Sequence, residues 1–156
     1  MKIFLRKANR SDDVGIWLVR TAAINDIGEK YYSRSEIAKW ASNEMAKNFG
    51  DIVEKDHWYI AVQENEIVAT GLLDVSGKSL GAIFVRPDQQ RKGLATMMLS
   101  KLEDVARDKG IDRLTLESTL NAFEFYEKNG FSIVKRSKYR LQNGYELDCI
   151  VMEKRI

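Results

Sequence analysis

The stretch Val85-Arg86-Pro87-Asp88-Gln89-Gln90-Arg91-Lys92-Gly93-Leu94-Ala95 decides the fold of this chain. An apolar segment precedes it, and the spacing of apolar residues after it is typical of an amphipathic helix. Pro87 is the only proline, and because proline cannot donate a ladder hydrogen bond we expect a strand to end there. Gly93 and Ala95 then place small residues in the first helical turn. The stretch therefore predicts a strand, a tight turn and a helix in direct succession.

The start of this helix is a candidate anion site. The first N–H groups of a helix have no intrahelical partner, and the helix dipole adds partial positive charge, so together they bind phosphate. Glycine at position 93 lets an anion approach the backbone closely. Three cations, Arg86, Arg91 and Lys92, belong to the same turn. A plain turn would also use this glycine, but neither of two other glycine-rich phosphate fingerprints occurs in the chain.

The flanking sequence predicts the remaining elements. Strands are expected at 2–7, 58–62, 66–74, 80–85, 113–117, 131–141 and 145–154, and helices at 11–24, 33–50, 94–108 and 121–128. Asn143-Gly144 is a strong hairpin signal between the last two strands. We therefore predict an α/β (α+β) fold, with a mixed, mostly antiparallel central sheet of about six to seven strands and about four helices.

Length and composition limit the classes of protein. The 156 residues suit one domain, 1–156. With 25 basic and 23 acidic side chains, the net charge of +2 gives no reason to expect a nucleic-acid partner. The single cysteine, Cys149, excludes an internal disulfide and a cysteine-based metal site. No membrane-spanning run and no signal-peptide pattern is evident, so we expect no membrane partner, no metal and a cytoplasmic location.

A second motif, Ala122-Phe123-Glu124-Phe125-Tyr126-Glu127-Lys128-Asn129-Gly130-Phe131, follows roughly 30 residues after the first. The first stretch resembles the acetyl-CoA signature of the GNAT superfamily of acetyl-CoA-dependent N-acetyltransferases, Val-x-Pro followed by Gln/Arg-x-x-Gly-x-Gly/Ala. The second resembles that family's Ala-x-x-Phe-Tyr-Glu-Lys-x-Gly-Phe. Two motifs in this order, together with a matching order of elements over nearly the whole chain, make the resemblance specific.

The resemblance implies acetyl-CoA as the cosubstrate. The N–H groups of residues 91–96 would hold the pyrophosphate, and the backbone of the 83–85 strand would pair with the pantetheine arm. This strand and the 113–117 strand would splay apart to leave a slot for the thioester. The residues then expected to bind the cofactor are Ile83, Phe84, Val85, Gln90, Arg91, Lys92, Gly93, Leu94, Ala95, Thr96, Thr119, Asn121, Phe123 and Tyr126.

Tyr126 is the main candidate for catalysis. When an amine attacks the thioester, the thiolate of CoA must leave, and a phenol within reach can donate a proton or a hydrogen bond to that sulfur. A backbone N–H near Val85 would polarise the carbonyl. Glu117, at a strand end beside the slot, is the first candidate for the base, although a solvated glutamate fits this position equally well. Asp74 and His57, the only histidine, are alternatives for the base.

One position departs from the family pattern. Thr119 stands where many members carry asparagine, and Asn121 is displaced from that position by two residues. Cys149 is expected in a strand core rather than as a nucleophile, and 135–140 as a solvated strand face.

The acceptor is predicted only as a primary amine of a small molecule or peptide. Tyr31, Tyr32, Arg34 and Trp40 lie in the region that usually frames it. A non-catalytic acyl-CoA-binding or sensing module is the alternative function, and a nucleotide-binding domain is disfavoured. A homodimer is compatible with such folds.

Overall fold

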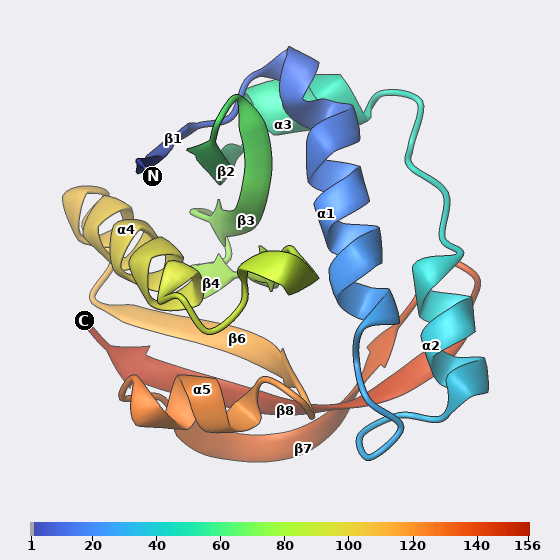
Figure 1. Ribbon diagram of the computed structural model, residues 1–156. Helices are drawn as coiled ribbons and strands as arrows, with labels where there is room; N and C mark the ends of the chain where they lie inside the picture. Colours follow the sequence, from blue (N-terminus) through green and yellow to red (C-terminus); the bar gives the residue numbers. More distant parts are fainter. Residues whose placement is uncertain (1) are drawn as a thin grey trace.

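The computed structural model describes residues 2–156 (Figure 1). Within this range the strands are β1 (Ile3–Lys7), β2 (His57–Gln63), β3 (Glu66–Asp74), β4 (Ser79–Leu80), β5 (Phe84–Val85), β6 (Arg113–Thr119), β7 (Ser132–Arg140) and β8 (Glu146–Arg155). The helices are α1 (Asp13–Asn25), α2 (Arg34–Ala41), α3 (Phe49–Lys55), α4 (Leu94–Asp108) and α5 (Phe123–Lys128), with short 3₁₀ turns at Arg10–Asp12 and Pro87–Gln89.

The strands form one sheet in the order β1-β2-β3-β4-β6-β8-β7, with β5 paired to β3 beside β4. Every pair is antiparallel except β4 with β6, which is parallel. The predicted fold class, a mixed and mostly antiparallel sheet with flanking helices, is confirmed. The first two helices of the chain, α1 and α2, pack together, and α2 lies beside the turn between β7 and β8, whereas α4 and α5 lie at the other side of the view (Figure 1).

The prediction of a single helix over 33–50 is wrong, because the structure has two helices there, α2 and α3. Ser33 begins α2 with a capping box, because its hydroxyl accepts from the Glu36 N–H while the Glu36 carboxylate accepts from the Ser33 N–H. At the other end the Ser42 hydroxyl donates to the Lys39 carbonyl at 3.1 Å, a local bond that competes with further helix. The chain then crosses to α3, which begins at the buried Phe49.

The strand expected over 80–85 is also divided in two, by a bulge. Leu80 pairs with Leu73 in β3, whereas Phe84 pairs with Thr70. Between these pairs β3 advances by three residues and its partner by four, so one extra residue lies in the 81–83 segment. Such bulges bend a strand and redirect its backbone, and here the bend turns 83–85 away from β6.

The main core lies between α4 and the sheet. Leu94, Met98, Leu99, Leu102 and Ala106 are buried on the inner face of α4, as the helical spacing predicts. They pack with buried side chains of β3, β6, α5 and β8. This packing fixes the N-terminus of α4 relative to the ends of β5 and β6, which is where the candidate site lies.

Gly71 of β3 sets how closely α4 approaches the sheet. A Cβ added at Gly71 would stand 2.8 Å from Met98 Cγ and 2.9 Å from Leu102 Cδ1. We expect Gly71→Val to lower the free energy of unfolding by about 1–3 kcal/mol through overpacking. Urea unfolding would measure the loss, with Gly28→Ala as the control because a Cβ there meets nothing within 4 Å. Equal stability of both variants would contradict close packing at Gly71.

Candidate active site

The turn before α4 is built from backbone conformations that open it to a ligand. Pro87 begins the 3₁₀ turn after β5, and its fixed φ suits a first helical position. Arg91 has φ 61° and Gly93 has φ 80°, so two residues of this short turn adopt the left-handed region. For a residue with a side chain this conformation costs about 1–2 kcal/mol, and such strain gathers at functional sites.

Six consecutive backbone N–H groups, those of residues 91–96, donate no hydrogen bond to any group in the described chain, 2–156. The first helical bond runs from the Met97 N–H to the Gly93 carbonyl at 3.0 Å. A Cβ added at Gly93 would meet nothing within 4 Å, so the N-terminus of α4 is uncovered. Free amides and the helix dipole are together suited to an anion, and the sequence predicts an anion site at this position.

The three cations of this turn do not act together as expected. Arg86 forms salt bridges with Glu66 at 2.8 Å and Asp88 at 2.7 Å, so its charge is already neutralised. Lys92 Nζ donates to Gln89 Oε1 at 3.3 Å and does not line the cavity. Arg91 alone of the three lines the cavity beside the free amides.

A cavity of about 590 Å³ extends from this turn to α5, and we call it the cofactor cavity. Of the residues expected to bind the cofactor, Ile83, Phe84, Val85, Gln90, Arg91, Gly93, Leu94, Ala95, Thr96, Thr119, Asn121 and Tyr126 line it. Phe123 does not line it, and Phe125, two residues further along α5, takes part in the wall instead, although both rings pack against the main core. Asn121 reaches the cavity despite its displacement from the family position.

A slot opens where β5 and β6 separate. The β4–β6 ladder ends at Leu80 and Leu116, while β6 continues to Thr119 paired only with β8. Past the bulge, β5 pairs only with β3, so its edge towards β6 carries no ladder bonds in the described chain. The splayed strands implied by the family resemblance are therefore present.

Tyr126 lies at this slot, and the second motif holds it there. The Phe131 N–H bonds to the Tyr126 carbonyl at 3.0 Å across Gly130, whose φ of 95° closes the end of α5. The Tyr126 ring packs edge to face against Phe125 and Phe131. Burial raises the pKa of Tyr126 to about 12, against a smaller lowering by the Ile83 amide. The phenol is therefore a neutral donor at physiological pH.

Glu117 projects from β6 and lines two cavities. Its Oε2 lies 3.7 Å from the Cys149 Sγ, which donates to it, and its side chain is otherwise exposed. Burial, together with the Glu117 charge, raises the pKa of the Cys149 thiol to about 11. Cys149 is thus a neutral buried thiol, consistent with a strand-core residue.

The alternative bases lie elsewhere. Asp74 closes the β3–β4 turn by accepting from the Gly77 N–H and the Ser76 hydroxyl, at 3.1 and 3.0 Å. His57 begins β2 and lines neither cavity, and desolvation lowers its pKa.

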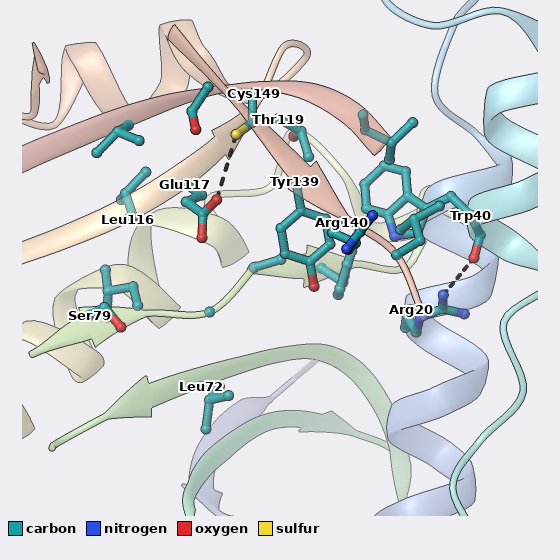
Figure 2. A pocket seen from close by; sticks show the side chains of 18 of the residues that line it. Arg20, Trp40, Leu72, Ser79, Leu116, Glu117, Thr119, Tyr139, Arg140 and Cys149 are labelled. Atoms are coloured by element: carbon teal, nitrogen blue, oxygen red, sulfur yellow. Dashed lines mark hydrogen bonds between the residues drawn. The ribbon is translucent and has the colours of Figure 1, made fainter. Parts of the chain in front are cut away.

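On the other side of the slot is a larger cavity of about 770 Å³, the acceptor cavity (Figure 2). Tyr32 and Trp40 line it as expected, whereas Tyr31 and Arg34 do not. The Tyr32 hydroxyl donates to the Asp148 carbonyl at 2.7 Å and accepts from the Leu120 N–H at 3.0 Å. Burial raises the pKa of Tyr32 to about 12, so this neutral phenol links the acceptor wall to the ends of β6 and β8.

Two parts of the acceptor wall were not expected from the sequence. Lys135, Ser137 and Tyr139 alternate along β7 and line the cavity, and this stretch is mostly exposed, in agreement with the predicted solvated strand face. Figure 2 shows the Tyr139 ring within the cavity. Arg20 of α1 is the other addition, and no sequence signal distinguishes it from an exposed arginine on an amphipathic helix.

The described part of the chain offers no group of three or more histidine, cysteine, aspartate or glutamate side chains placed to hold a metal ion. None of the helices described between residues 2 and 156 is long and apolar enough to cross a bilayer.

Three features thus surround one slot: the uncovered N-terminus of α4, the edge of β5 that is free for pairing, and the neutral phenol of Tyr126. The site fits a diphosphate joined to an extended amide-containing arm that ends in a reactive group, and the fold and site together define an acyl-CoA-dependent transferase.

Comparisons with known proteins agree with this class. The family model described as Acetyltransferase (GNAT) family matches residues 21–131. The ribosomal protein bS18-alanine N-acetyltransferase of Escherichia coli (strain K12) is 30% identical over 126 residues, 76% of this chain and 82% of that protein. The peptidyl-lysine N-acetyltransferase YjaB of Salmonella typhimurium is 25% identical over 141 residues, 88% of this chain and 89% of that protein.

Solved structures agree as well. A GCN5-related N-acetyltransferase from Rhodopseudomonas palustris superposes with a TM-score of 0.90 at 25% identity, covering 100% of this chain and 97% of that one. The PaiA N-acetyltransferase from Thermoplasma acidophilum, solved in complex with coenzyme A, shares the fold with a TM-score of 0.78 at 20% identity, covering 100% of both chains. The chain belongs to the GNAT acetyltransferase family and is an N-acetyltransferase that uses acetyl-CoA as cosubstrate.

Proposed function

We propose that this protein transfers the acetyl group of acetyl-CoA to a primary amine by direct attack in a ternary complex. The observation that supports this best is a shared wall. Trp40, Ala82, Phe84, Glu117 and Thr119 line both the cofactor cavity and the acceptor cavity. A thioester that enters from one side and an amine that enters from the other would meet at this wall, and holding both there supplies much of the rate enhancement.

Glu117 is the proposed base. The attacking amine must be neutral, and the exposed carboxylate of Glu117 lies on the shared wall without a salt bridge to any described residue. It would accept the proton from the amine, directly or through a water molecule, as the C–N bond forms and the C–S bond breaks.

Tyr126 would stabilise the departing thiolate by a hydrogen bond rather than by full proton transfer. The pKa of Tyr126 is raised to about 12, whereas an ordinary thiol has a pKa near 8.5, so moving the proton to sulfur would be uphill by roughly 5 kcal/mol. A hydrogen bond to the charged sulfur requires no such transfer and contributes about 1.5–3 kcal/mol. Burial of the ring keeps water away from this contact.

The test is a panel of amines, including amino acids, polyamines and short peptides, with release of free CoA thiol as the signal. Peptides belong in the panel because the two curated relatives are named for protein acceptors. We expect thiol release only when an acceptor is present, and no acetylated enzyme by intact mass when it is absent. An acetyl group found on Cys149 before the acceptor is added would contradict direct attack.

A further inference from the structure

Arg20 is a buried cation in the acceptor cavity. It lies on the buried face of α1 with Ile16 and Ile24, and only 9% of its surface is exposed. Its guanidinium donates to the Trp40 carbonyl at 2.7 Å and to the Thr21 hydroxyl at 3.2 Å, and it stacks on the Trp17 ring at 4.2 Å. No acidic side chain of residues 2–156 forms a salt bridge with it. Buried charges are usually paired, so this one lacks an anion.

A second donor without a partner lies in the same wall. The Nε1–H of Trp58 is buried and has no acceptor in the described chain, and Trp58 lines the acceptor cavity. Trp58 and Trp17 both pack edge to face against Phe49. Trp17 is also the ring on which the Arg20 guanidinium stacks. The guanidinium of Arg20 has donors only, so this end of the cavity is suited to an anion, whereas the Trp58 nitrogen is buried too deeply to reach a ligand without a rearrangement of its ring.

A negative charge, opposite to that of Arg20, lies at the shared wall. Glu117 carries a carboxylate that no described cation neutralises, and an acceptor amine would be drawn to it. Arg20 donates to the carbonyl of Trp40, one of the residues of the shared wall, and Figure 2 shows Arg20 beside Trp40, with Glu117 on the other side of Tyr139. Of the remaining charged residues of the cavity, Lys135 and Arg140 are exposed to solvent, unlike Arg20, and Asp148 is paired with Lys138, unlike Glu117.

We propose that the acceptor is a small zwitterion, an amino acid or a similar amino-carboxylate, whose carboxylate is bound by Arg20 while its amine faces Glu117. This inference rests on the proposed acetyl transfer and adds the class of substrate. The planar guanidinium binds a carboxylate through two parallel hydrogen bonds, which also fixes the direction of the acceptor. A polyamine would place a second cation at the Arg20 end, and a residue inside a peptide would bring a neutral amide there.

The wild-type enzyme alone provides the first test. For several amino acids, kcat/KM is measured for the free acid, its primary amide and the corresponding decarboxylated amine, again by thiol release. We expect the free acid to be preferred over both analogues by about 10- to 100-fold, because a hydrogen-bonded charge pair would be lost. An amide or an amine that reacts as well as the acid would overturn the inference and leave acetyl transfer intact. Absence of transfer to every amine would overturn both.

Two variants then assign the preference to Arg20. Arg20→Gln removes the charge at similar length, and we expect the ratio of kcat/KM for acid over amide to fall to within about threefold of unity, mainly through loss on the acid. Arg140→Gln removes an equal charge from the exposed part of the same cavity and should leave most of the preference in place. An equal fall in both variants would indicate a general field and overturn a specific role for Arg20.

Discussion

Replacing Tyr126 by phenylalanine is expected to lower kcat by about 10- to 100-fold while the KM for acetyl-CoA changes little. The expected loss in kcat corresponds to the free energy of one hydrogen bond to a charged sulfur, because this bond forms only as the thiolate develops in the transition state. The fold should tolerate the change, because the ring packs against Phe125 and Phe131 and the hydroxyl has only the backbone amide of Ile83 as a partner in the described chain. Steady-state kinetics on a good acceptor measures the effect.

The pH profile separates a hydrogen-bond donor from a base. Because burial raises the pKa of Tyr126 to about 12, the phenol stays protonated at every pH at which the enzyme is assayed. The ratio of wild-type to Tyr126→Phe rates should therefore stay constant between about pH 6 and pH 10. A ratio that grows as the pH rises would show instead that the tyrosinate takes part as a base.

Tyr59→Phe is the matched control for this experiment. Tyr59 is a half-buried tyrosine of β2 whose pKa desolvation also raises, and it lines neither cavity. Loss of its hydroxyl should change kcat by less than about twofold. If the two variants had the same activity, Tyr126 would have no part in the chemistry.

The features predicted well from the sequence depend on residues close together in the chain. The turn before α4 needs only Pro87, a glycine at 93 and the following helix, and the end of α5 needs only Gly130 to bring Phe131 back to Tyr126. Both motifs are held by short-range backbone bonds, so a local pattern is enough to find them.

The features that were missed depend on distant contacts. The bulge at 81–83 follows from how two segments register against β3, and composition carries no sign of it. That alternate residues of β7 line the acceptor cavity depends on distant segments, because Tyr32, Trp40 and Arg20 line the same cavity. Arg20 has no distinguishing pattern on α1, and only the packing against Trp17 and Trp40 reveals a buried charge without an anion.

Introducing a carboxylate at Gly93 is expected to raise the Kd for acetyl-CoA by about 100-fold or more. At roughly 5 Å and an effective dielectric constant of 20, a single negative charge repels each phosphate charge by about 3 kcal/mol, or about 100-fold in affinity. The side chain would also occupy the open space in front of the free amides of 91–96. Isothermal titration calorimetry of Gly93→Glu with CoA gives the affinity directly, without any acceptor.

The chain contains a close control at the other end of the same helix. Gly110 has φ 78° against 80° for Gly93, and a Cβ at either position would meet nothing within 4 Å. Gly110→Glu therefore imposes the same backbone strain and adds the same charge far from the cofactor cavity. We expect its Kd for CoA to match that of the wild type. A glutamate at the N-terminus of α4 interacts favourably with the helix dipole, and circular dichroism of both variants checks that the helix is kept despite the backbone strain. If a folded Gly93→Glu bound CoA as tightly as Gly110→Glu, the diphosphate would not lie at the N-terminus of α4, and the assignment of the cofactor cavity would be wrong.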